Sequence, residues 1–149
     1  MTWALFVTSL PSIVLGHLFG GLLLMLGMAK APRYRGGVLR VTWRAWVADR
    51  WVYSTTVGHC MALHPRRGSL TEWHEGVHIF QYEDLCLLGA IIGGLCCIVS
   101  WRLGLILWAT SGAPWLLPNF VSGWIRFGDP YMGSEHERSA YAQTFRESL

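Results

Sequence analysis

Charged side chains are scarce in this chain of 149 residues, since only 14% are Asp, Glu, Lys or Arg. None of the first 29 residues is charged, whereas hydrophobic residues make up 52% of the chain. An average soluble domain carries about 25% charged residues, so this composition argues against that class and favours a membrane protein. Sequence repeats and low-complexity tracts are also missing, which argues against a solenoid or a disordered chain.

Basic residues are missing ahead of the first apolar stretch, where a cleaved secretory signal peptide would carry them. Residues 3–28 supply 26 mainly apolar positions, or about 39 Å of α-helix. We therefore expect residues 1–29 to form an N-terminal transmembrane anchor. The four cysteines include the adjacent pair Cys96 and Cys97, and their spacing indicates no disulfide framework.

Charge is unevenly distributed along the chain. Residues 30–67 contain eight basic residues and one acidic residue, whereas residues 68–149 contain four basic and eight acidic residues. We expect residues 30–52 to form a basic juxtamembrane segment on the cytoplasmic side, in contact with anionic lipid headgroups. A nucleic-acid partner would use the same charge, but no recognised binding motif supports it, so nucleic acid is an unlikely partner.

The chemically distinctive segment is His74-Glu75-Gly76-Val77-His78, which is an HExxH motif. Residues four apart on an α-helix are separated by about 400°, so both imidazoles lie on one face and can bind one Zn²⁺. Glu75 lies about 100° further round the helix, where its carboxylate can take a proton from a zinc-bound water. The motif therefore predicts a zinc site with Glu75 as the catalytic general base of a metallopeptidase.

The flanking residues predict a helix over residues 70–82. Ser69 and Glu72 have the spacing of a capping box, which marks a helix start. Apolar side chains recur at helical spacing on one stripe, and polar side chains occupy a separate face. The stripe consists of Leu70, Trp73, Val77 and Phe80, and the polar face of His74, His78 and Gln81. The alternative is a surface helix with two solvated histidines.

A zinc site needs a third protein ligand, and residues 134–142 contain the densest downstream group of candidates. We choose Glu137. The chain resembles the glutamate zincins, in which a later helix supplies a metal-binding Glu in an ExxA[D/Y]-like motif, here Glu137-Arg138-Ser139-Ala140-Tyr141. This resemblance implies that His74, His78 and Glu137 bind Zn²⁺ and that Ala140 lets the two helices approach. Accessory candidates are Tyr141, Glu135 and His59.

Two further segments carry the resemblance. Residues 53–63 are similar to the β-rich segment before the HExxH helix in small phage and bacterial zincin-like domains. Such a strand commonly binds an extended peptide by β-addition. The order of apolar segments is similar to that of membrane-embedded heat-shock and prenyl-protein proteases, which usually have Asp where this chain has Tyr141. The carboxylate that would orient a zinc-bound imidazole must then come from another residue.

The metal hypothesis also constrains the apolar region at residues 85–121. A single membrane crossing there would separate Glu137 from the two histidines. We therefore expect a hydrophobic helical hairpin that turns near Arg102, although a buried pair of helices on one side of the membrane would also satisfy the constraint.

Together these patterns predict a mainly α membrane protein with a minimal zincin-like core at residues 53–149. The core comprises the HExxH helix, a short preceding β element and a C-terminal ligand helix, with the metal site on the cytoplasmic side. The predicted function is zinc-dependent hydrolysis of a peptide or protein substrate at a membrane. The alternative is a non-enzymatic membrane or virion protein, for structure, assembly or pore formation, with a vestigial or structural metal site.

Overall fold

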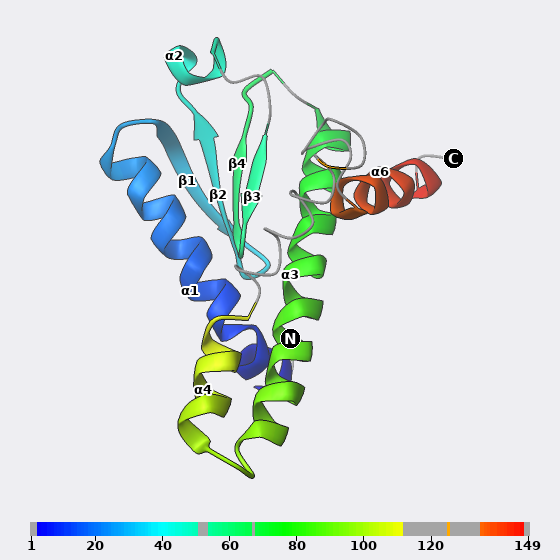
Figure 1. Cartoon of the computed structure of the whole chain (residues 1–149). Helices are drawn as coiled ribbons and strands as arrows, with labels where there is room; N and C mark the ends of the chain where they lie inside the picture. Colours follow the sequence, from blue (N-terminus) through cyan, green and yellow to red (C-terminus); the bar gives the residue numbers. More distant parts are fainter. Residues whose placement is uncertain (1–2, 51–53, 67, 112–124, 126–134, 148–149) are drawn as a thin grey trace.

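A computed structural model of the chain describes residues 3–50, 54–66, 68–111, 125 and 135–147. A small sheet lies between two long helices, α1 (Trp3–Met25) and α3 (Ser69–Cys96) (Figure 1). Two shorter helices, α4 (Trp101–Ala109) and α6 (Glu135–Glu147), pack against α3. The molecule is therefore mainly helical, as expected, with a sheet at its centre.

The sheet has the strand order β1-β2-β4-β3, and only the pairing of β2 with β4 is parallel. Its strands are β1 (Ala29–Arg35), β2 (Val38–Trp43), β3 (Thr55–Val57) and β4 (Cys60–Leu63). Residues 30–52, expected to form a juxtamembrane segment, thus contain most of β1, all of β2 and the short helix α2 (Ala45–Ala48). The short β element expected at residues 53–63 is only the β3–β4 half of this larger sheet.

Along each strand, side chains alternate between the two faces of the sheet, and each long helix packs against one of these faces. On the α1 face, Cys60 and Val41 pack in a cluster with Leu23 of α1. On the α3 face, Val38 and Met61 pack with Ile79 of α3. Since strand residues alternate in this way, both faces of β2 and β4 are covered, and these two strands form the centre of the core.

Helix α3 differs from the sequence expectation at both ends. Gly68 is its N-cap and no side chain caps the helix, so the predicted capping box is wrong. Glu72 instead forms an ion pair with Arg40 of β2. The helix also continues well beyond Tyr82, so the HExxH motif and the following apolar leg belong to one helix of 28 residues.

The burial of α3 follows the predicted apolar stripe only in part. His74 and Glu75 are 6% and 3% exposed, whereas Trp73 and Phe80 of the apolar stripe are 48% and 62% exposed. Trp73 and Phe80 line a cavity of about 480 Å³ between α3 and the β1–β2 end of the sheet. Val77 of the stripe is 3% exposed, so the stripe indicated the core only in part, and α3 also buries His74 and Glu75.

Helices α3 and α4 form the described part of the expected hairpin, with their connection at residues 97–100, next to Arg102 (Figure 1). Glycine allows a close approach, because a Cβ on Gly93 would lie 2.6 Å from the carbonyl oxygen of Gly104. Residues 112–121 of the predicted hairpin lie outside the described residues. Two segments, Phe6–Met25 and Ser69–Cys96, are long and apolar enough to cross a membrane.

Two glycines of α1 provide a matched test of the α1–sheet contact. A Cβ on Gly16 would lie 2.5 Å from the backbone nitrogen of His59, whereas a Cβ on Gly21 meets nothing within 4 Å. We predict that Gly16→Ala lowers the free energy of unfolding by about 1–3 kcal/mol through overpacking. Gly21→Ala should raise it by up to about 1 kcal/mol through helix propensity. Thermal unfolding in detergent measures both, and equal effects would contradict this packing.

Candidate metal centre

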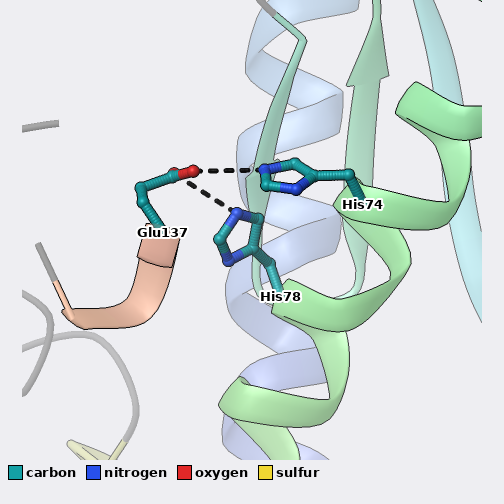
Figure 2. Close-up of side chains that lie close together, drawn as sticks. All are labelled: His74, His78 and Glu137. Carbon is teal, nitrogen blue, oxygen red and sulfur yellow. Dashed lines mark hydrogen bonds and ion pairs between the residues drawn. The ribbon is translucent and has the colours of Figure 1, made fainter. Parts of the chain in front are cut away.

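Three side chains from two helices converge at the upper end of α3 (Figure 2). His74 and His78 lie one turn apart on α3, and Glu137 projects toward them from α6. His74 and Glu137 are buried and His78 is partly buried, and one ligand atom from each lies within 4.8 Å of the others. The structure thus brings together the three residues predicted as metal ligands.

The contacts within this cluster fit a metal ion. The Nε2 atoms of His74 and His78 lie 3.1 and 3.2 Å from the two carboxylate oxygens of Glu137. Ligand atoms about 2.0–2.1 Å from a tetrahedral zinc would lie roughly 3.3 Å apart. The His78 contact also lacks hydrogen-bonding geometry, so Nε2 of this buried imidazole has no hydrogen-bond partner among the described residues. His74 Nε2 is within hydrogen-bonding distance of Glu137, and the same three side chains are close enough together to bind one metal ion.

Gln81 holds one imidazole in the tautomer that metal binding needs. Its Oε1 lies 2.8 Å from Nδ1 of His78, and an Nδ1–H that donates to this amide oxygen would leave Nε2 available to a metal once that nitrogen is deprotonated. His74 has no such support, because its buried Nδ1 lacks a partner among the residues described. The ring of Tyr141 packs against the His74 ring, with centroids 4.4 Å apart. Tyr141 therefore contributes ring packing to the cluster.

The charge on Glu137 is stabilised by the same two histidines. Burial alone would raise the pKa of its carboxyl group, but the contacts with His74 and His78 lower that pKa to about 2. The residue is therefore a carboxylate at neutral pH, which is the form that binds a cation. Two imidazoles and one carboxylate form a donor set that could hold a metal ion.

Glu75 lies on the buried side of α3, next to the edge strand β3. The hydroxyl of Thr56 donates a hydrogen bond of 2.6 Å to Oε2 of Glu75, and it also lies 3.2 Å from the Glu75 carbonyl oxygen. The sheet thus fixes Oε2 of Glu75, and this contact also sets the orientation of the second carboxylate oxygen. Thr56 was not predicted as a site residue, because its pairing with Glu75 depends on how the sheet meets the helix.

The accessory candidates have different positions. The partners of His59 are residues outside the cluster. Its Nδ1 is 2.9 Å from Ser12 Oγ of α1, and its Nε2 is 3.1 Å from Glu83 Oε1 of α3. His59 is 2% exposed, so it connects α1, the sheet and α3 in the interior. Tyr141 contacts His74 as described. Glu135 begins α6, and its side chain lies outside the described part of the structure.

No protein-family model, curated protein or solved structure matches this chain.

We predict that the purified chain binds one equivalent of zinc. His74→Ala and Glu137→Gln should each weaken binding by at least about 100-fold, because each removes one of the three ligands found among the described residues. Glu75→Gln should keep the metal, since Glu75 is outside the ligand set. Metal analysis after dialysis against a weak chelator measures all three, and zinc retention in Glu137→Gln would contradict the site.

Gln81 offers a separate test of the tautomer argument. We predict that Gln81→Ala weakens zinc binding by about 10–100-fold, as is usual when a metal-bound histidine loses its supporting hydrogen bond. The matched control is Gln143→Ala, because Gln143 is exposed on α6. Competition with a fluorescent zinc chelator gives both affinities, and an unchanged affinity in Gln81→Ala would refute the role of Gln81.

Proposed function

We propose that this chain is a membrane-associated zinc peptidase of the glutamate-zincin type. The observation that carries the proposal is the convergence of His74, His78 and Glu137 beside Glu75. Two histidines at helical spacing, a carboxylate from a later helix and a neighbouring buried Glu are the parts that metal-assisted amide hydrolysis requires.

Each residue of the site has a distinct role in the proposed reaction. His74, His78 and Glu137 would hold Zn²⁺, which supplies a water of pKa about 7 and polarises the substrate carbonyl. The Glu75 carboxylate takes the proton of the attacking water and delivers it to the leaving amine. Thr56 holds Oε2 of Glu75 and so keeps the carboxylate at a fixed angle to the metal ligands.

The edge strand β3 supports a peptide as the substrate. Within the described sheet, β3 pairs only with β4, so its other edge has backbone groups that an added strand could pair with. Thr56 lies in the middle of β3 and contacts the general base. A peptide that paired with β3 would therefore run past Glu75 in an extended conformation, which suits hydrolysis of a backbone amide.

We predict that Glu75→Gln lowers the rate of peptide hydrolysis by about 10²–10⁴-fold, the usual contribution of a general base. The zinc-loaded chain in lipid vesicles is incubated with a mixture of random peptides, and new termini are identified by mass spectrometry. The same preparation of Glu75→Gln must retain its zinc for the comparison to be valid.

Two results would contradict the proposal. Failure of the zinc-loaded wild-type chain to generate new termini would favour a structural metal site in a non-enzymatic protein. Alternatively, hydrolysis that persists unchanged in Glu75→Gln would identify a contaminating protease or a different base.

A further inference from the structure

The cavity between α3 and the β1–β2 end of the sheet is separate from the cluster of His74, His78 and Glu137. Its lining residues on α3 recur mainly at spacings of three and four, so they share one side of the helix. They are Ser69, Glu72, Trp73, Gly76, Val77, Ile79, Phe80 and Glu83. Gly76, in the middle of this set, is two residues from each histidine, or about 200° round the helix. In Figure 1, α6 lies on one side of α3 and the sheet on the other.

Two basic side chains line this cavity from the sheet. Arg35 lies at the end of β1, and Arg40 lies in β2. Burial lowers the pKa of Arg40, and the nearby charge of Arg35 lowers it further. The two guanidinium groups are therefore close enough to repel each other. An anion bound beside them would offset this repulsion.

The acidic residues of the cavity already have partners. Glu72 forms an ion pair with Arg40, and Glu83 Oε1 lies 3.1 Å from Nε2 of His59. Arg35, by contrast, forms no ion pair with any residue that the structure describes. The buried Nε–H of Arg40 also has no acceptor among the described residues. The cavity thus offers positive charge and unused donors to one further anionic group.

The rest of the cavity wall is apolar. It consists of Val38, Met61, Trp73, Val77, Ile79 and Phe80. The rings of Trp73 and Phe80 remain largely exposed, although their neighbours on the sheet side are buried. A ligand with an apolar body would cover these two rings and remove their surface from water.

The size of the cavity limits the length of that apolar body. At about 30 Å³ for a group the size of a water molecule, a cavity of about 480 Å³ holds roughly 16 such groups. This volume suits one acyl chain of about twelve carbons with its carboxylate, and it is too small for a phospholipid with two chains.

We propose that this cavity binds a single-chain apolar carboxylate. The carboxylate accepts hydrogen bonds from Arg35 and from the Nε–H of Arg40. The chain lies against Trp73 and Phe80. Such a site is independent of the proposed peptidase activity, because its residues lie on the other side of α3 from the histidines.

The test measures dodecanoate binding to the full-length chain in an uncharged detergent. Native mass spectrometry counts the bound molecules over a series of concentrations. Methyl dodecanoate is the matched compound, since it has the same chain without the charge. We expect one dodecanoate per chain, bound about 10–100-fold more tightly than the ester, because the ester cannot form charge-assisted hydrogen bonds. Equal binding of the two compounds would overturn the proposal.

Variants of exposed residues locate the bound molecule. Arg35→Gln should weaken dodecanoate binding at least about tenfold. Arg44→Gln is its matched control, because Arg44 is exposed just beyond the other end of β2 and does not line the cavity. Phe80→Ala should weaken binding about five- to tenfold through lost apolar contact. Leu87→Ala, also exposed on α3 but outside the cavity, should leave it unchanged. Unchanged affinity in Arg35→Gln would overturn the proposal.

Two further measurements test other modes of binding. A carboxylate is also a ligand for zinc, so the titration is repeated on Glu137→Gln, where dodecanoate should bind as in the wild type. Loss of binding in that variant would place the carboxylate at the metal cluster and overturn the proposal. Phosphatidylglycerol, an anion with two chains, should not displace dodecanoate. Displacement at equal concentration would identify a membrane lipid as the occupant and overturn the single-chain assignment.

Discussion

The contact of Glu137 with two imidazoles of α3 is the constraint on which the remaining architecture depends. A carboxylate that is only 5% exposed is costly unless positive charge or hydrogen-bond donors surround it, and the two histidines lower its pKa to about 2. Glu137 and the histidines are 59 or more residues apart, so the chain between them must leave α3 and return to the same side. The turn from α3 into α4 at residues 97–100 begins that return.

Part of this arrangement was predictable from local sequence. The HExxH spacing identified His74 and His78, and the motif that begins at Glu137 identified the third member of the cluster. Such signals can be read because helical spacing alone decides which side chains share a face. The catalytic role of Glu75 and the bound zinc remain predictions.

Other features depend on long-range packing and were missed. The parallel pairing of β2 with β4 joins segments that are separated by β3, and neither segment carries a local signal for it. The apolar stripe indicated the burial of α3 only in part, because apolar periodicity assumes that polar side chains face water. Here His74 and Glu75 have partners on α6 and β3, so their face can be buried, whereas Trp73 borders a cavity. Gln81 was noted only as polar, although its place three residues after His78 brings the two together.

Because α3 is uninterrupted, it fixes the distance between its two ends and also the rotation of one end relative to the other about the helix axis. Each residue added to a helix rotates everything beyond it by about 100°. One residue inserted between His78 and Leu85 would therefore turn the histidines well away from α6 while the end of α3 that packs against α4 kept its orientation. Seven inserted residues would restore the phase to within about 20°, at a distance along the axis greater by about 10 Å. The metal cluster is thus compatible only with insertions that add a nearly whole number of helical turns.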